Sequence, residues 1–379
     1  MVNHSHGGNI EAAVREFALS GSEIIDFSAN INPLGYPPQL PEIIKSNIGR
    51  IIHYPDPKAL ALREKLGERF SLDPRTILVG NGSTELIYLM PRALKPKSAG
   101  LIVPTYSDYE RALRQVETAI AFIGTKEEDD FTLNTLEFAP GTEMVFLGNP
   151  NNPTGTLLEK DFLLEVIHCN PGTIFVVDEA FIDFLPRPEE YSLIKEAVEL
   201  ANLVVLRSMT KFFALPGLRL GYLVSSSKIV ESLEKYQEPW TINTLAQAAG
   251  EHIIFEDEYI RRSRDFISTE KDFFYQALAQ IGPFYPFKPS VNFILVRMAE
   301  GRWWNKKSKI QGADQLRKVL IKEGFLIRDC SSFRGLDRRF FRLAVRTRQE
   351  NRGIVSALRR IAHRSKYSSY NGPKHRTVC

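Results

Sequence analysis

The segment MVFLGNPNNPTGTLLEKDFLLEVIHCNPGTIFVVDEAF, residues 144–181, holds two short apolar runs on either side of a helical pattern. The runs MVFLG (144–148) and TIFVVD (173–178) are rich in β-branched and aromatic residues, which favours buried strands. Between them, residues 159–168 place apolar side chains at helical spacing. A strand, a helix and a second strand in this order predict two parallel strands joined by a crossover helix.

The same alternation continues on both sides of this segment. Four further apolar runs are predicted strands, and residues 107–117 have a helical pattern; the runs are TILVG (76–80), GLIVP (100–104), NLVVLR (202–207) and LGYLV (220–224). The pattern predicts an α/β fold with a mostly parallel sheet and helices on both faces. In such a sheet, ligands bind at the carboxyl ends of the strands.

From about residue 256 the pattern changes to a long charged helical stretch and three short apolar segments: SVNFILVRM (290–298), FLIRDC (325–330) and FFRLAVRT (340–347). This change predicts a smaller α+β domain, and the run TRQE (347–350) has the form of a capping box that starts a final helix. We therefore expect four parts: an N-terminal segment associated with the small domain (1–47), a large domain that carries the parallel sheet (48–255), the small domain (256–364) and a flexible basic tail (365–379).

The charge distribution and the cysteines indicate which partners and which cellular location the protein has. The 379 residues include 49 Lys or Arg and 45 Asp or Glu, a formal net charge of +4. Seven of the basic residues lie in 351–379, which has no acidic residue, so the remaining chain is slightly acidic. This distribution predicts neither nucleic acid nor a membrane as a partner. Three widely spaced cysteines and a polar N-terminus favour a reducing, cytoplasmic location.

Several common cofactor motifs are absent from the sequence. GNGSTE (80–85) lacks the third glycine of a dinucleotide fingerprint, and no phosphate-binding loop with a G-K-[ST] ending occurs. No HExxH motif or clustered Cys and His residues indicate a catalytic metal, so we expect none.

Polar groups instead follow the predicted strands in series. NGSTE (81–85) opens a helix and can bind an anion or serve as an ordinary N-cap, and NPNNPTG (149–155) can be a plain turn. Asp178 and Glu179 end an apolar strand, where a buried carboxylate needs a partner. SMTK (208–211) then places a lysine after the next strand.

The ordered series NPNNPTG, DEAF, SMTK and GLRLGY resembles the fold-type-I pyridoxal-phosphate enzymes of the aminotransferase class I/II family. Such enzymes need a lysine for a Schiff base, a carboxylate at the pyridine nitrogen and an anion site for the phosphate. The resemblance implies that Lys211 forms the Schiff base and that Asp178 pairs with the pyridine nitrogen. It also implies that Asn152 forms a hydrogen bond to the ring oxygen O3′. It implies stacking by Tyr106 on the ring and a phosphate site made of Gly82, Ser83, Thr84, Ser208 and Arg219.

Tyr54, in the segment HYPDP, matches a tyrosine that in this family reaches the cofactor phosphate of the neighbouring subunit. The resemblance therefore implies a homodimer.

Phe181 departs from the usual DEAY pattern of the family, because its ring carries no hydroxyl. With HGGN (6–9), DFSANINPLG (26–35), EPWTINTLA (238–246) and LIRDC (326–330), the chain resembles the subgroup that decarboxylates L-threonine O-3-phosphate. Its product is (R)-1-amino-2-propanol O-2-phosphate, used for the nucleotide loop of cobalamin.

The subgroup resemblance also implies the residues that bind the substrate. Arg342 matches the arginine that binds the substrate carboxylate, with Asn152 beside it, and Arg328 matches one that binds the phosphate. His6, Ser28 and Asn30 resemble further phosphate contacts. Without the cofactor motifs, the two arginines would be read as members of ion pairs.

Two other functions remain open at this stage. A histidinol-phosphate aminotransferase, or another aminotransferase of the family, shares most of these cofactor motifs. A regulator that uses this fold as a sensor is the second, although only some fifty residues precede Tyr54.

Overall fold

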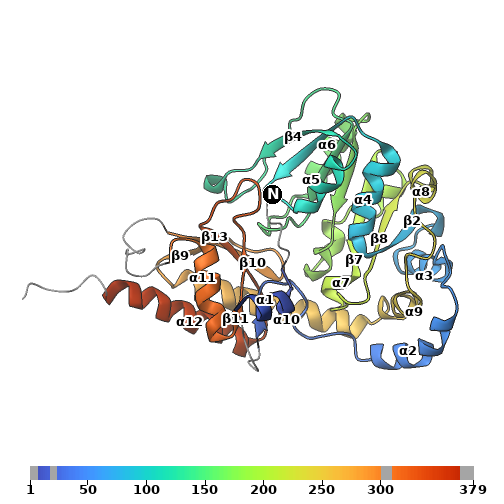
Figure 1. Ribbon diagram of the computed structural model, residues 1–379. Helices are drawn as coiled ribbons and strands as arrows, with labels where there is room; N and C mark the ends of the chain where they lie inside the picture. The colour runs from blue at the N-terminus through green and yellow to red at the C-terminus, as the bar shows by residue number, and fades with distance from the viewer. Residues whose placement is uncertain (1–6, 18–23, 300–309, 368–379) are drawn as a thin grey trace, which may run out of the picture.

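The computed structural model describes residues 7–17, 24–299 and 310–367 (Figure 1). The described residues form a central sheet of seven strands in the order β2-β8-β7-β6-β5-β3-β4. The strands are β2 (Ile77–Asn81), β3 (Ser98–Val103), β4 (Ala119–Gly124), β5 (Met144–Gly148), β6 (Ile174–Asp178), β7 (Leu203–Ser208) and β8 (Leu220–Ser225). Only β8 runs antiparallel to its neighbours in this sheet. The prediction of a mostly parallel α/β sheet is confirmed.

Strand β4 was missed by the sequence analysis. It pairs only with β3, at the edge of the sheet. Its sequence, AIAFIG, is an apolar run, yet its residues are exposed or half-buried along their whole length. An apolar run therefore marks this edge strand too, and the run alone does not tell it from a buried strand.

Helices cover both faces of the large sheet because successive strand residues point to opposite sides. In β6, Phe175 and Val177 join one apolar cluster, whereas Val176 joins the other. The first face packs against α3 (Leu60–Phe70), α6 (Lys160–Cys169) and α9 (Thr244–Ile253). The second packs against α4 (Gly82–Leu94), α5 (Ser107–Arg114) and α8 (Ser227–Glu234). This covering leaves the strand ends as the place for a ligand.

A smaller antiparallel sheet follows in the order β12-β13-β10-β9. Its strands are β9 (Phe284–Pro286), β10 (Phe293–Met298), β12 (Arg328–Asp329) and β13 (Phe340–Ala344), and its helices are α10 (Asp257–Ala279), α11 (Ala313–Leu320) and α12 (Arg348–Tyr367). Figure 1 shows α10 extending from the large sheet to this smaller one. The predicted domain boundaries at residues 47, 255 and 364 stay predictions; α12 continues to Tyr367, past the expected start of the tail.

The segment FLIRDC is divided between two sheets. β11 (Phe325–Leu326) pairs in parallel with β1 (Ile25–Asp26), whereas Arg328 and Asp329 pair with β13. The N-terminal chain therefore supplies a strand to the C-terminal half, a long-range pairing that no local pattern announces. The first helices, α1 (Ile10–Phe17) and α2 (Leu40–Asn47), flank this segment.

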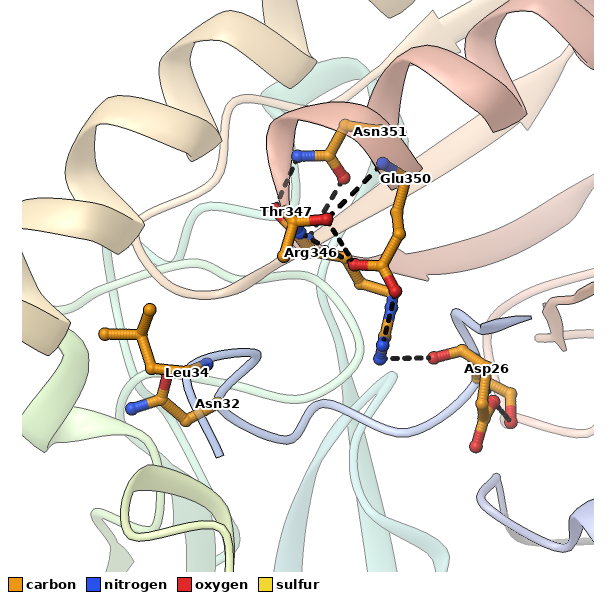
Figure 2. Close-up of polar contacts among 8 residues, drawn as sticks. Asp26, Asn32, Leu34, Arg346, Thr347, Glu350 and Asn351 are labelled. Carbon is orange, nitrogen blue, oxygen red and sulfur yellow. Dashed lines mark hydrogen bonds and ion pairs between the residues drawn. The ribbon is translucent and has the colours of Figure 1, made fainter. Parts of the chain in front are cut away.

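The predicted capping box at the start of α12 is confirmed (Figure 2). The backbone N–H of Glu350 donates to Thr347 Oγ1 at 3.4 Å, and the N–H of Thr347 donates to Glu350 Oε2 at 3.0 Å. Arg346 adds a link to the N-terminal segment, because its Nη1 donates to the carbonyl of Asp26 at 3.1 Å and its Nη2 donates to Glu350 Oε1 at 2.8 Å. The cap thus joins α12 to β1.

Candidate active site

A pocket lies where β5, β6 and β7 end and α4 and α5 begin. Its lining brings together six residues that the sequence analysis singled out: Ser83, Thr84, Tyr106, Asn152, Asp178 and Lys211. Phe181 and Tyr109 also line it. The carboxyl ends of neighbouring parallel strands therefore meet here, as expected for this class of sheet.

Lys211 lies in α7 (Met209–Phe212), a single turn directly after β7. Its Nζ donates to Ser208 Oγ at 2.9 Å and lies 5.9 Å from the centre of the Phe181 ring. Burial lowers the pKa of Lys211 to about 8, and the charge of Arg219 acts in the same direction, whereas Asp178 opposes the shift. A substantial fraction of the amine is thus neutral near pH 8, as a nucleophile requires.

Asp178 ends β6 and is 7% exposed. Its Oδ2 accepts a hydrogen bond from the Tyr109 hydroxyl at 2.7 Å, and its Oδ1 accepts one from the backbone N–H of Ala180 at 2.9 Å. Burial raises the pKa of Asp178, and the bond from Tyr109 and the charge of Lys211 counteract that rise. The expectation that this carboxylate needs partners is confirmed.

Glu179 has a structural role on the other side of the strand end. Its carboxylate accepts from Ser192 Oγ and from the N–H of Leu193, both at 2.7 Å, and lies 2.9 Å from Arg207 Nε. These partners satisfy a side chain with no exposed surface. The two adjacent carboxylates are therefore distinct, and only Asp178 lines the pocket.

Tyr109 was not singled out by the sequence analysis. It lies on α5, three residues after Tyr106, which is the N-cap residue of that helix. Its ring stacks on Phe146 at 5.2 Å and meets Tyr106 edge-on at 5.6 Å. The signal that could have found it is a second tyrosine on the buried face of a helix next to the predicted site.

The N-terminus of α4 forms a cradle beneath Arg219. Gly82 has a φ of +73°, and a Cβ built on it would lie 2.5 Å from Arg219 Nη2, so no larger side chain fits without displacement. A Cβ on Gly221 would lie 2.4 Å from the backbone nitrogen of Ser83. Exposed N–H groups at a helix start and a nearby guanidinium suit a phosphate.

Arg328 and Arg342 lie opposite each other on β12 and β13, so their side chains share one face of the small sheet. Both are buried, at 7% and 5% exposure. Arg342 Nη1 bonds to Asn152 Oδ1, and Nη2 donates to the carbonyl of Ser28 at 3.0 Å. Burial lowers the pKa of Arg342 to about 10, and the charge of Arg328 adds to the effect.

The structure does not support the alternative that Arg342 is simply one member of an ion pair. Within the described part of the chain, Arg342 forms no salt bridge with a carboxylate, and its Nε is buried without a hydrogen-bond partner. Arg328 lies 5.3 Å from the Phe333 ring centre. For Arg342, a buried guanidinium without a carboxylate partner in the described chain is costly, which suits a site that receives an anionic ligand.

The N-terminal segment contributes to the same region. Ser28 and Asn30 are 3% and 5% exposed, and Asn30 Oδ1 is buried without a partner among the described residues. A Cβ on Gly7 would lie 2.1 Å from the Ser28 carbonyl, so the chain at residue 7 lies against this segment. His6 itself lies outside the described residues.

Tyr54 does not line the pocket of its own protomer. Its side chain is 80% exposed and packs against Trp240 at a ring distance of 4.8 Å. Its predicted role across a subunit boundary stays a prediction.

Comparison with known proteins shows which family the chain belongs to. Residues 22–358 match the model of the family described as aminotransferase class I and II, so the chain belongs to this family. Enzymes of the family use pyridoxal 5′-phosphate, and the site fits that cofactor through the Lys211 amine, the buried Asp178 carboxylate and the cradle at Gly82.

Individual relatives within this family show which of its enzymes the chain is similar to. The chain is 35% identical over 367 residues to the threonine-phosphate decarboxylase of Salmonella typhimurium, covering 95% of this chain and 97% of that protein. It is 35% identical over 363 residues to the adenosylcobalamin biosynthesis bifunctional protein CobDQ of Leptospira interrogans, of which it spans 41%. The solved L-threonine-O-3-phosphate decarboxylase of Porphyromonas gingivalis has a TM-score of 0.80 at 28% identity, covering 89% of this chain and 99% of that one. Several histidinol-phosphate aminotransferases match at 28–34% identity.

The electrostatic setting of Lys211 generates a first prediction. In the cofactor-free protein, competitive acetylation read by mass spectrometry should give Lys211 a pKa near 8. Asp178→Asn removes a charge that raises this pKa, so its value should fall; Arg219→Gln removes a charge that lowers it, so its value should rise. The labelling curve of exposed Lys58 is the internal control. Equal Lys211 curves in all three proteins would contradict the arrangement.

Tyr109 generates a second prediction. Tyr109→Phe removes a hydrogen bond to the charged form of Asp178, so the pKa of Asp178 should rise further. Because a hydrogen bond to a charged group contributes about 1.5–3 kcal/mol, we expect cofactor affinity to fall roughly tenfold or more, measured by titrating the cofactor-free protein. Tyr88→Phe, which removes a 3.3 Å bond to Asp108 away from the pocket lining, is the matched control and should bind normally. Wild-type affinity in Tyr109→Phe would exclude this role.

Proposed function

We propose that the protein decarboxylates L-threonine O-3-phosphate with pyridoxal phosphate, giving (R)-1-amino-2-propanol O-2-phosphate for cobalamin biosynthesis. The observation that carries the proposal is the pair of buried arginines, Arg328 and Arg342, side by side beside the cofactor pocket. A substrate with a carboxylate and a phosphate supplies one anion for each. The similarity to threonine-phosphate decarboxylases supports the same substrate class.

Each residue of the pocket has a separate role in this proposal. The cofactor, when bound, supplies the electron sink that accepts the electrons of the broken bond. Lys211 would hold it covalently, Asp178 would keep the proton on its pyridine nitrogen and Asn152 would bind O3′. Tyr106 would stack on the ring, while Gly82, Ser83, Thr84, Ser208 and Arg219 would bind its phosphate. Lys211 Nζ, once released from the cofactor, would be the proton donor to the substrate Cα after CO₂ leaves.

The small sheet and the N-terminal segment would orient the substrate. Arg342 binds the carboxylate in this proposal, and its contact with Asn152 links that grip to the cofactor pocket. Arg328 binds the phosphate, with Ser28, Asn30 and His6 as further phosphate contacts. Holding both ends would fix the orientation of the substrate Cα in the pocket, and that orientation would decide which of its bonds breaks.

Aminotransferase activity on histidinol phosphate is the second candidate, favoured by the relatives of that name. The two reactions need the same lysine and carboxylate. Phe181 lines the pocket, is 6% exposed and packs edge-on against Phe293 at 5.0 Å, so its position offers no hydroxyl to the cofactor oxygen. This departure from the aminotransferase pattern supports the decarboxylase.

Substrate assays test the proposal directly. The cofactor-loaded protein should release CO₂ from L-threonine O-3-phosphate, and Arg328→Gln should lower kcat/KM by about 10–100-fold because a charge-assisted contact is lost. Arg334→Gln, which alters a half-exposed arginine paired with Glu110, is the control and should leave the rate unchanged. Glutamate production from histidinol phosphate and 2-oxoglutarate, without CO₂ release from threonine phosphate, would refute the assignment.

We also propose that the enzyme is a homodimer, located in the cytoplasm. Support for the dimer comes from an apolar surface around Tyr54, where Ile48, Ile51, Ile52 and Trp240 are each between 48% and 78% exposed. Such a continuous exposed patch is typical of an interaction site. In the dimer, Tyr54 would reach the cofactor phosphate of the neighbouring subunit. Within the described ranges, no helix has the length and apolarity needed to cross a membrane.

Mixed dimers test the role of Tyr54. Lys211→Ala should be inactive and Tyr54→Ala impaired, each as a homodimer. In a mixed dimer of the two variants, one active site receives both defects and the other receives none if Tyr54 acts across the interface. Each mixed dimer should therefore have about half the wild-type activity, so an equal mixture should rise to roughly one quarter of the wild-type value after random subunit exchange. If every mixture stays as inactive as its parents, Tyr54 acts within its own subunit or not at all.

A further inference from the structure

A second cavity of about 430 Å³ lies beside the turn that carries Lys211. It is bounded by the ends of β7 and β8, by α7, by the connection after β6 and by the start of α10. No residue lines both this cavity and the cofactor pocket. The volume falls in the range of small-molecule sites.

The cavity has apolar walls and a hydroxyl in its lining. Phe70, Phe212, Phe213 and Ile260 contribute rings and an aliphatic side chain to the lining. Tyr222 also lines it, and its hydroxyl has no hydrogen bond to any described residue. A hydroxyl in the wall of a cavity can donate a hydrogen bond to a ligand or to water.

The charges that line the cavity are mostly positive, with five basic side chains against two acidic ones. Arg207 is held in place by Glu179 at 2.9 Å and by Asp183 at 2.8 Å, and Arg69 pairs with Asp257 at 2.8 Å. Arginines bound in this way shape the cavity but are already neutralised.

Arg264 differs from those arginines. Its Nε donates to the backbone carbonyl of Asp183 at 3.1 Å, and it forms no salt bridge with any carboxylate of the described chain. Burial lowers its pKa; the charges of Asp183 and Glu189 oppose this shift, whereas those of Arg69 and Arg207 add to it. Because its guanidinium has no ion pair within the described chain, it can pair with an anionic ligand.

We propose that this cavity is a second binding site, which takes a small organic anion with a flat apolar body. The body packs among the rings of Phe70, Phe212 and Phe213, and the anionic group pairs with Arg264. Tyr222 supplies a further polar contact within the cavity. None of the groups proposed to hold the anion, Arg264, Tyr222 and the three phenylalanines, belongs to the proposed cofactor site, although Ser208 lines the cavity and is also a proposed phosphate contact of the cofactor.

Such a ligand would contact the Lys211 turn from outside the cofactor pocket. Ser208, Met209 and Phe212 line the cavity, and Ser208 Oγ accepts the hydrogen bond of Lys211 Nζ at 2.9 Å. Occupancy of the site is therefore readable as a change in the absorbance of the bound cofactor.

Binding of 8-anilinonaphthalene-1-sulfonate, an aromatic sulfonate, tests the site in the cofactor-loaded enzyme. Fluorescence titration should give a dissociation constant that rises about tenfold or more in Arg264→Gln, because a charge-assisted contact is lost. Arg262→Gln, an exposed arginine two residues away on α10, should bind as the wild type does. Ile260→Phe, which fills part of the cavity and leaves the arginines in place, should also weaken binding.

Equal affinity in the wild type, Arg264→Gln and Ile260→Phe would overturn the proposal, as would the absence of binding by the wild-type enzyme. Circular dichroism of aromatic side chains checks that each variant is folded. If Arg264→Gln is unfolded, Ile260→Phe alone decides the question. CO₂ release, measured without the probe, reports separately on the proposed reaction.

Discussion

The buried carboxylate of Asp178 is the constraint on which the arrangement of the site depends. A charge at the end of a central strand is stable only where the surrounding chain supplies compensating groups. Here they come from three separate elements: the Tyr109 hydroxyl from α5, the N–H of Ala180 after β6 and the charge of Lys211 after β7. The same interaction acts back on Lys211, because Asp178 limits how far burial can lower the pKa of the amine. Asp178 and Lys211, the carboxylate and the amine that a pyridoxal-phosphate enzyme needs, thus each influence the pKa of the other.

The small sheet presents the opposite problem, an excess of buried positive charge. Arg328 and Arg342 face the same side of adjacent strands; burial lowers the pKa of Arg342, and the charge of Arg328 adds to that effect. The protein tolerates this because Arg342 donates to two oxygens, of Asn152 and Ser28, rather than to a carboxylate. Neutral acceptors hold the side chain without cancelling its charge. The arginine pair is therefore positioned in advance for an anion.

The sequence predicted the features that arise from local pattern and ordered motifs. It located the buried strands, the capping box of α12 and six residues that line the cofactor pocket. These features are visible in the sequence because they depend on apolar runs and on polar residues that directly follow them. It missed β4, whose edge position leaves its residues exposed, and Tyr109, whose importance comes from the distance to Asp178. The division of FLIRDC was also beyond reach, because it depends on pairing with β1 some three hundred residues earlier.

That distant pairing explains how two separate sheets come to share one site. β1 adds to β11, the N–H of Ala344 donates to the carbonyl of Phe27, and the N–H of Asn32 donates to the carbonyl of Lys211. The chain from residue 25 to residue 32 therefore touches the arginine strand at one end and the lysine turn at the other. The β13 strand that carries Arg342 and the turn that carries Lys211 are therefore joined by one short stretch of backbone. If these residues have the roles proposed above, this stretch fixes the position of the substrate-binding strand relative to the cofactor-binding turn.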